Sequence, residues 1–190
     1  MIKIGILGEI GSGKSFVAKN FLLPLFNADY EVIKIYKSNK KCFRLLKKKF
    51  PKDITNFPID KNELSRLILK KQSNLKILGN IIHPFVQANL RKFLKKNVKR
   101  KAIVLDIPLL VENKLYDKST ILVYVDASKK NITKKLIKRG NFNSKIYRIM
   151  KKSQKTKKFK KKISKFVIKN NFKYNETKNK IKKIKKIILK

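Results

Sequence analysis

The residues Gly8-Glu9-Ile10-Gly11-Ser12-Gly13-Lys14-Ser15 decide the fold of this 190-residue chain. They match G-x-x-x-x-G-K-[ST] at every fixed position, and the apolar run before them, residues 2–7, predicts a buried strand. Glycines permit backbone angles that side chains disfavour, so the N–H groups of such a turn can converge on a polyphosphate. The strand, this turn and a helix over residues 13–23 therefore predict a phosphate-binding loop. A chance match in an ordinary loop is the alternative, and the flanking strand and helix weigh against it.

The loop supplies most of the residues that we expect to bind ATP. Lys14 is placed to reach the β- and γ-phosphates, and the Ser15 hydroxyl is placed to hold Mg²⁺. A dinucleotide-binding fingerprint, G-x-G-x-x-G, is excluded because Phe16 stands where a small residue is needed. The expected ATP contacts in this region are Gly8, Gly11, Ser12, Gly13, Lys14, Ser15 and Phe16.

The composition is that of one globular domain with room for a small lobe or lid. Hydrophobic residues make up 42% of the chain, enough for a sizeable core. The one cysteine, Cys42, excludes an internal disulfide and favours a reducing compartment, so we expect the cytoplasm. The first strand begins at once and leaves no room for a signal peptide, and no apolar run approaches the roughly 20 residues of a membrane helix.

The net charge of +41 favours a nucleic-acid partner at first sight. Arginine, which reads bases and binds phosphates bidentately, accounts for only six of the 52 basic residues. Lysine is spread along nearly the whole chain, which indicates an A+T-rich coding bias expressed at surface positions. We therefore expect no specific nucleic-acid partner; the alternative, an RNA-associated NTP-binding protein, would need arginine and aromatic clusters on one face. The lysine-rich residues 151–165 are expected to be solvated and partly mobile.

Strands alternate with helices along the chain, and the strands are unbroken apolar runs. This pattern predicts a parallel sheet covered by helices on both faces. The expected strands are residues 2–7, 25–27, 102–106, 120–125 and 166–168. The expected helices are residues 13–23, 31–50, 61–71, 74–82, 84–96, 129–138, 143–154 and 175–189, with Asp60 and His83 as caps. Isoleucines on one face of the last helix are expected to dock on the sheet, with a membrane-surface helix as the alternative.

The order of several motifs resembles that of dephospho-CoA kinase. The phosphate loop resembles that family's G-G-I-G-S-G-K-S, and Asp106-Ile-Pro-Leu-Leu-Val-Glu112 is close to its D-V-P-L-L-F-E. Three further matches are weaker alone but keep the same order: Asn27-Ala-Asp29 for D-A-D, Ile82-His-Pro84 for I-x-H-P, and Val167-Ile-Lys-Asn170 for V-I-x-N. Ile59-Asp60-Lys61 with Leu64 is similar to the family's L-D-R…L. The phosphate loop is generic, whereas the ordered set is specific.

The resemblance implies a three-layer α/β/α P-loop kinase fold with a parallel five-stranded sheet, a helical acceptor-binding lobe and a lid. It places the core at residues 1–54 and 101–190, the acceptor lobe at about 55–100 and the lid at about 139–155. The implied reaction is transfer of the ATP γ-phosphoryl group to the 3′-hydroxyl of dephospho-CoA, the last step of coenzyme A biosynthesis. Mg²⁺ is the implied cofactor, and we expect a monomer or weak homo-oligomer without a membrane partner.

Two aspartates are candidates for the chemistry because each follows a predicted strand, where open α/β sheets bind ligands. Asp29 is the candidate base that accepts the hydroxyl proton, and an N-cap for a helix starting near residue 30 is its alternative role. Asp106 is expected to support Mg²⁺ through water or to orient the acceptor, and a structural carboxylate is its alternative.

The remaining candidates depend more on the resemblance. Arg139 is the expected lid cation over the transferring group, with ordinary surface charge as the alternative and Arg148 as a weaker second candidate. The resemblance places His83 in the acceptor-binding region, with Leu109 as a further substrate contact, although the residues themselves favour a helix cap at His83 before Pro84. Asn170 is expected to contact the adenine or ribose, or else to be a turn residue.

Four positions depart from the family pattern. Asn27 replaces the first Asp of D-A-D, Lys165 stands where the family has Asp, and Lys61 and Lys135 stand where Arg is usual. Lysine keeps the charge of arginine but loses its planar fork, which weakens precise orientation of an anion. Another small-molecule or nucleotide kinase of the same fold, or an inactive relative, therefore stays open as an alternative.

Overall fold

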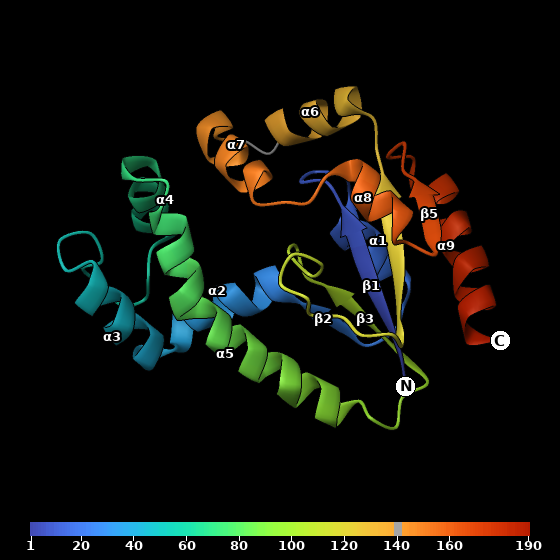
Figure 1. Cartoon of the computed structure of the whole chain (residues 1–190), viewed down its shortest axis with the longest axis horizontal. Helices are drawn as coiled ribbons and strands as arrows, with labels where there is room; N and C mark the ends of the chain where they lie inside the picture. Colours follow the sequence, from blue (N-terminus) through green and yellow to red (C-terminus); the bar gives the residue numbers. More distant parts are fainter. Residues whose placement is uncertain (139–141) are drawn as a thin grey trace. The chain divides into compact units, whose positions relative to one another are not determined.

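The computed structural model describes residues 1–138 and 142–190, and within them the chain forms a five-stranded sheet in the order β2-β3-β1-β4-β5 (Figure 1). Every strand pair is parallel, so the carboxyl ends of all the strands meet at one edge. The strands are β1 (Ile2–Gly8), β2 (Leu25–Asn27), β3 (Ala102–Asp106), β4 (Thr120–Asp126) and β5 (Phe166–Lys169). The predicted sheet is confirmed, with strand bounds that differ by at most one residue from those expected.

The chain divides into two compact units, residues 1–27 with 97–190, and residues 28–96. The first contains the sheet with α1 (Lys14–Asn20), α6 (Lys129–Ile137), α7 (Ser144–Lys152), α8 (Lys157–Lys162) and α9 (Tyr174–Leu189). The second contains α2 (Ala28–Ser38), α3 (Lys40–Lys49), α4 (Lys61–Lys70) and α5 (Asn74–Lys96). Residues 28–54, which the sequence analysis assigns to the core, therefore pack with the helices that follow them in the chain.

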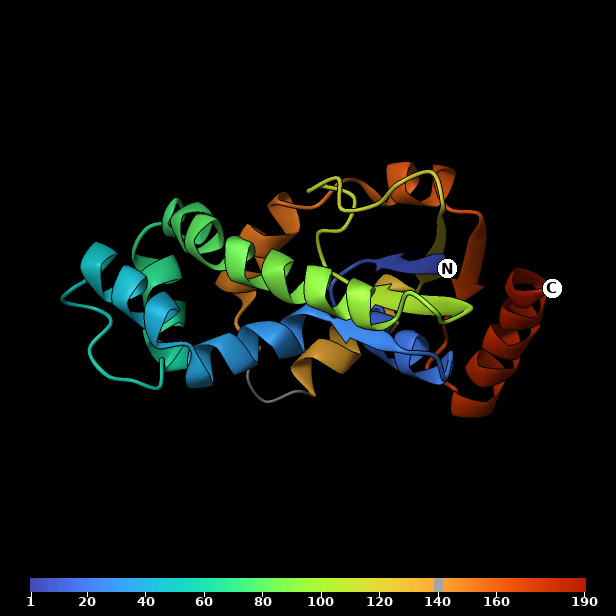
Figure 2. The same ribbon diagram turned by 90° about the horizontal axis from the view of Figure 1, so that it is seen from below.

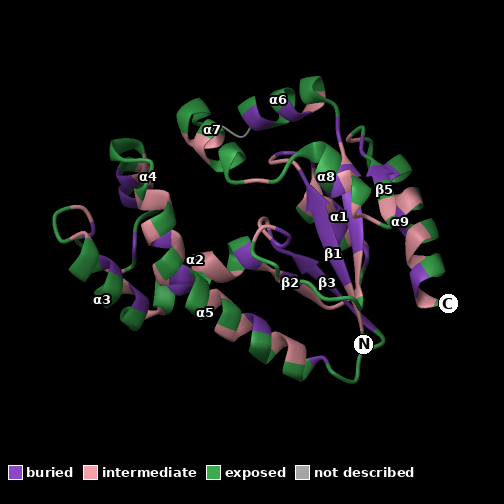
Figure 3. Cartoon of the chain, viewed as in Figure 1, coloured by how far each residue is buried: buried purple, intermediate pink, exposed green. Residues whose placement is uncertain are grey.

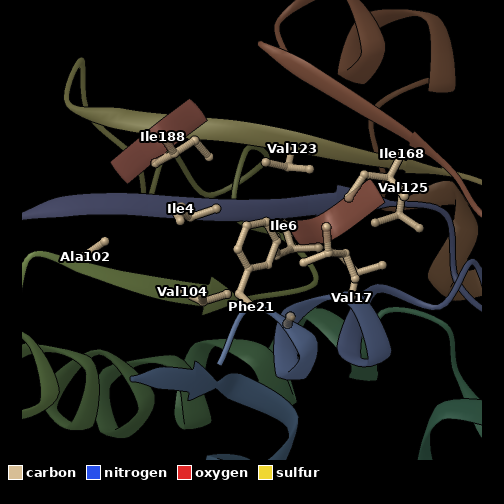
Figure 4. Packing of buried hydrophobic residues seen from close by; sticks show 12 residues of the cluster. Ile4, Ile6, Val17, Phe21, Ala102, Val104, Val123, Val125, Ile168 and Ile188 are labelled. Carbon is tan, nitrogen blue, oxygen red and sulfur yellow. The ribbon is translucent and has the colours of Figure 1, made fainter. Parts of the chain in front are cut away.

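Helices α1 and α9 pack on the same face of the sheet (Figure 4). Ile4 and Ile6 of β1 face Val17 of α1 and Phe21, which directly follows that helix, and all four side chains are fully buried. Burial is concentrated along the strands, as Figure 3 shows, because helices cover them. Isoleucines of α9 complete this core, which confirms that the last helix docks on the sheet. They are Ile181 and Ile188, with Ile184 packed beside them and Ile187 exposed.

The lysine-rich residues 151–165 are more ordered and more buried than their composition predicts. Lys160 is only 2% exposed, and α8, which carries it, packs against β1. Two carboxylates hold the segment: Glu112 accepts from the Lys160 ammonium (2.9 Å) and the Lys155 backbone N–H (2.8 Å), and Asp126 pairs with Lys157 and Lys161 (2.6 Å each). Most residues of this segment are exposed as expected, but the expectation of a solvated stretch is wrong at Lys160, because its carboxylate partner lies far away in the sequence.

The second unit has a hydrophobic core of its own. Figure 2 shows α2 and α5 running alongside each other, and buried residues from all four helices and the connecting segment form one cluster. The predicted helix over residues 31–50 is wrong in being continuous, since it divides at Asn39. The Asn39 side chain accepts a hydrogen bond from the backbone N–H of Cys42 (2.9 Å), so it caps a new helix there.

Helix α5 continues through Pro84, so the predicted helix end at Ile82 and fresh start after His83 are both wrong. Proline removes one backbone donor and usually bends or ends a helix. Here Leu78 and Ile82 before it and Leu90 after it are all buried, at spacings of four and eight residues. Packing along one stripe on both sides of Pro84 outweighs the lost hydrogen bond. In the part of the chain that is described, no helix is long and apolar enough to cross a membrane.

Candidate functional site

The glycine-rich loop between β1 and α1 forms a tight turn that needs two of its glycines. Gly11 and Gly13 have φ angles of 83° and 91°, in the left-handed region that side chains rarely adopt. Space excludes a side chain as well, because a β-carbon on Gly13 would lie 2.3 Å from Nδ2 of Asn170. The backbone N–H of Ser12 donates to the Glu9 carbonyl (3.1 Å) and closes the turn. The loop is thus formed by the chain's own packing.

Polar side chains of the loop turn inward on it. The Lys14 ammonium donates to the carbonyl oxygens of Glu9 (2.9 Å) and Gly8 (3.2 Å), so it lies folded over the loop. Ser12 is buried, and among the described residues its hydroxyl has no hydrogen-bond partner. Ser15 follows Lys14 in the first turn of α1 and is exposed. This arrangement gathers a cation and hydroxyl groups at the carboxyl end of β1.

The neighbouring strands bring an amide and a carboxylate to the same edge. The β2–β3 register sets Asn27 beside Asp106, and the Asn27 amide donates to Oδ2 of Asp106 at 2.6 Å. Asp106 is 3% exposed, so this hydrogen bond compensates for part of its lost hydration. An aspartate at position 27, as in the family pattern, would instead set two like charges side by side. The departure at Asn27 is therefore accommodated by a hydrogen bond.

A second carboxylate stands at the end of β4. Burial raises the pKa of Asp126, but hydrogen bonds from the ammonium groups of Lys157 and Lys161 outweigh this and hold the pKa below its ordinary value. The pairs therefore stabilise the fold at neutral pH, and this contribution is lost as the pH falls through the lowered pKa. Glu9 of the loop lies 3.9 Å from the Lys151 ammonium of α7. The sequence predicts no role for Asp126 or Glu9, although Asp126 stands at the end of a predicted strand as Asp106 does.

Two other residues expected to bind ATP take part in packing around the loop. The Phe16 ring packs against the core shared by α1 and α9 and meets the Tyr174 ring edge-on at 5.5 Å. Asn170 follows β5 directly and is buried, with its side-chain amide donating to the Ser12 carbonyl. Both residues thus lie beside the phosphate loop, and their expected contacts with ATP stay predictions.

The other expected residues belong to the acceptor lobe, the segment after β3 and the lid. Asp29 is exposed and lies in the first turn of α2, which begins at Ala28, so it is not the cap of a helix starting near residue 30. His83 lies within α5 and is not a cap; its imidazole lies against Gly79 one turn earlier, and this partial burial lowers its pKa. Leu109 is half-buried after β3. Arg139 lies outside the described residues, and Arg148 is an exposed residue of α7.

A phosphate loop at the carboxyl edge of a parallel sheet is the arrangement that P-loop kinases share. Shikimate kinase from Acinetobacter baumannii has the same fold at 14% identity, with a TM-score of 0.53 over 100% of this chain and 93% of that one. Within this class the match is specific, because the dephospho-CoA kinase family model matches residues 2–176. The chain belongs to the dephospho-CoA kinase family, which confirms the expected phosphotransferase of coenzyme A biosynthesis and disfavours the RNA-associated alternative.

Curated relatives agree with this assignment, and a solved structure shares the fold. A dephospho-CoA kinase of Wolbachia from Brugia malayi is 39% identical over 132 residues, 66% of this chain and 68% of that protein. The Ehrlichia canis enzyme is 31% identical over 74% of this chain and 73% of its own length. A crystal structure from Thermus thermophilus is 26% identical, with a TM-score of 0.76 over 96% of this chain and 95% of that one. The chain thus aligns with about two thirds of these curated relatives' length. The likeness to the Thermus thermophilus structure confirms the expected fold.

Proposed function

We propose that this chain transfers the γ-phosphoryl group of ATP to the 3′-hydroxyl of dephospho-CoA, giving coenzyme A and ADP. The observation that carries the proposal is the phosphate loop, formed in full between β1 and α1 with Lys14 folded over it. Phosphoryl transfer depends mainly on positioning and on neutralising the phosphate charges, and a fixed loop with an ammonium group folded over it supplies both. Membership of the dephospho-CoA kinase family supports the choice of acceptor.

The loop and the carboxylate at the end of β3 have separate roles in this proposal. Backbone N–H groups of the turn bind the phosphates, and the Lys14 ammonium exchanges the Gly8 and Glu9 carbonyls for β- and γ-phosphate oxygens. Ser15 and Asp106 offer the hard oxygen donors that Mg²⁺ prefers, and Mg²⁺ binds proteins through few such groups together with substrate phosphates. When bound, the ion neutralises charge on the transferring group. These two residues would hold it.

The acceptor side of the proposal is assigned residue by residue. Asp29 follows the last residue of β2 by two positions, and we assign it as the base that accepts the hydroxyl proton while the oxygen bonds to phosphorus. His83 and Leu109 are assigned to acceptor contact, and Arg139 to the lid. We place the enzyme in the cytoplasm as a monomer or weak homo-oligomer, in keeping with the single, buried Cys42.

A coupled ADP-release assay tests the proposal directly. The protein is supplied with ATP and Mg²⁺, and dephospho-CoA, adenosine and shikimate are offered as parallel acceptors, with an RNA arm that contains no acceptor. We expect turnover with dephospho-CoA at least about a hundredfold above the Lys14→Met variant, since one charge-stabilising donor is worth roughly 10²–10³ in rate. Turnover with shikimate or adenosine alone would reassign the acceptor, and phosphate release that requires RNA would favour the rival class.

Substituting Gly13→Ala tests the loop itself. The left-handed φ of 91° and the close approach of Asn170 both oppose a β-carbon, so we expect the free energy of unfolding to fall by about 1–3 kcal/mol. We expect Mg·ATP binding, measured by calorimetry, to weaken at least about tenfold, because the turn must shift. Gly79→Ala is the matched control for ATP binding, since Gly79 is helical, lies outside the loop and would bring a β-carbon no closer than 3.3 Å to the His83 imidazole. Unchanged ATP binding by Gly13→Ala would contradict the role of this turn.

A further inference from the structure

We propose that Asn170 is a positioning residue of the phosphate loop, and that Thr177 in turn orients Asn170. The sequence suggested a contact with the adenine or ribose, but the geometry points to a different task. Asn170 fixes the peptide unit between Ser12 and Gly13, through which it acts on the bound phosphates. The inference rests on the proposed ATP-binding function of the loop.

The side-chain amide of Asn170 is buried and forms its hydrogen bonds with other groups of the protein. The residue is 4% exposed, and its backbone N–H donates to the Asp126 carbonyl at 2.7 Å, which fixes its main chain to the end of β4. Its side-chain Nδ2 donates to the Ser12 carbonyl at 2.8 Å, across a sequence separation of 158 residues. A buried amide with these partners is built to hold the loop.

The other end of the amide determines which way it faces. Oδ1 accepts two hydrogen bonds, from the backbone N–H of Phe172 (2.9 Å) and from the hydroxyl of Thr177 (3.1 Å). Rotating the amide by 180° would turn its NH₂ group toward these two donors and its oxygen toward the Ser12 carbonyl, so all three hydrogen bonds would be lost. Thr177 is fully buried in α9 and has its hydroxyl committed to this contact. The donor is therefore aimed at Ser12 by α9.

Holding the Ser12 carbonyl also sets the next N–H group of the loop. A trans peptide unit is planar, and its C=O and N–H point in opposite directions. Because the Ser12 carbonyl points toward Asn170, the Gly13 N–H points away from Asn170. Gly13 is matched to this contact, since a β-carbon there would lie 2.3 Å from Nδ2. Asn170 thus presents a backbone donor for phosphate binding without touching the ligand.

Asn170→Asp is the decisive variant because it keeps the shape of the side chain and replaces the donor with an acceptor. Calorimetric binding is measured with two probes, Mg·ATP and magnesium tripolyphosphate, which lacks base and ribose. We expect both affinities to fall by a similar factor of roughly ten or more, because the carboxylate repels the Ser12 carbonyl. The loss should shrink as the pH is lowered, since a protonated carboxyl can again donate to Ser12. Thr177→Val should weaken both probes in the same way, by a smaller factor of roughly three.

Asn171→Asp is the matched control. Asn171 is exposed and donates to Glu176, so the same chemical change beside it should leave both affinities unchanged. Weaker ATP binding with unchanged tripolyphosphate binding would overturn the proposal in favour of a base or ribose contact. Lower thermal stability with both affinities unchanged would overturn it in favour of a purely structural turn. The two binding probes need no acceptor, so failure of the dephospho-CoA assay would leave this test decisive.

Discussion

Replacing Asp29 with asparagine lowers the kcat of phosphoryl transfer to dephospho-CoA by roughly 10²–10⁴-fold, the range that a general base contributes. Asparagine cannot accept the hydroxyl proton as the oxygen bonds to phosphorus. The KM for ATP stays within about twofold, because phosphate binding belongs to the loop after β1. Steady-state kinetics with both substrates varied separates these effects. The absence of a product burst in the first turnover would show that chemistry limits the rate.

The structure provides a control for the helix position of Asp29. A carboxylate in the first turn of α2 also interacts with the helix dipole, which is worth about 0.3–1 kcal/mol of stability. Glu31 lies in the same turn but accepts from Asn89 (2.8 Å) and pairs with Lys34 (3.3 Å). Glu31→Gln therefore makes the same charge change at a structurally engaged carboxylate, and kcat should stay near its original value. Full activity of Asp29→Asn would remove Asp29 as the base.

The sheet and the phosphate loop were predictable because their determinants are local. An unbroken apolar run such as residues 102–105 predicts a strand covered on both sides, and the glycine spacing of residues 8–15 marks the loop in the sequence, although the distant Asn170 also packs against the folded loop. The bounds of β3 agree with the prediction to the residue. Helix continuity was less predictable. Asn39 ends a helical pattern by a side-chain hydrogen bond, whereas Pro84 fails to end one because packing overrides it.

The candidate site was predictable as a set of residues and unpredictable as a set of partners. Asn170 was selected for a ligand contact, yet its hydrogen bonds go to Ser12 and Thr177. The register of β2 and β3 brings Asn27 beside Asp106. No local sequence pattern predicts that the amide at position 27 finds a hydrogen-bond partner there. Charge runs mislead for the same reason. A lysine-rich segment is predicted to be solvated because its carboxylate partners lie many residues away in the sequence and cannot be identified from it.

Substituting Lys160→Met lowers the free energy of unfolding by roughly 3–5 kcal/mol, the cost of leaving one member of a buried ion pair alone. Lys160 and Glu112 approach to 2.9 Å with both side chains at most 10% exposed. Among the described residues, the second oxygen of Glu112 is already without a hydrogen bond, so this carboxylate depends on its ammonium partner. Urea unfolding at neutral pH measures the loss.

The double variant Lys160→Met with Glu112→Gln distinguishes an unpaired charge from lost packing. Glutamine removes the buried charge but keeps an oxygen for the Lys155 N–H, so most of the lost stability should return. Lys158→Met in the same helix is the matched control, since Lys158 is exposed and surface changes stay within about 0.5 kcal/mol. Equal effects of Lys160→Met and Lys158→Met would mean that the pair is screened like a surface pair. A large loss that Glu112→Gln does not restore would mean instead that the aliphatic stem of Lys160, packed where α8 meets β1, carries the stability.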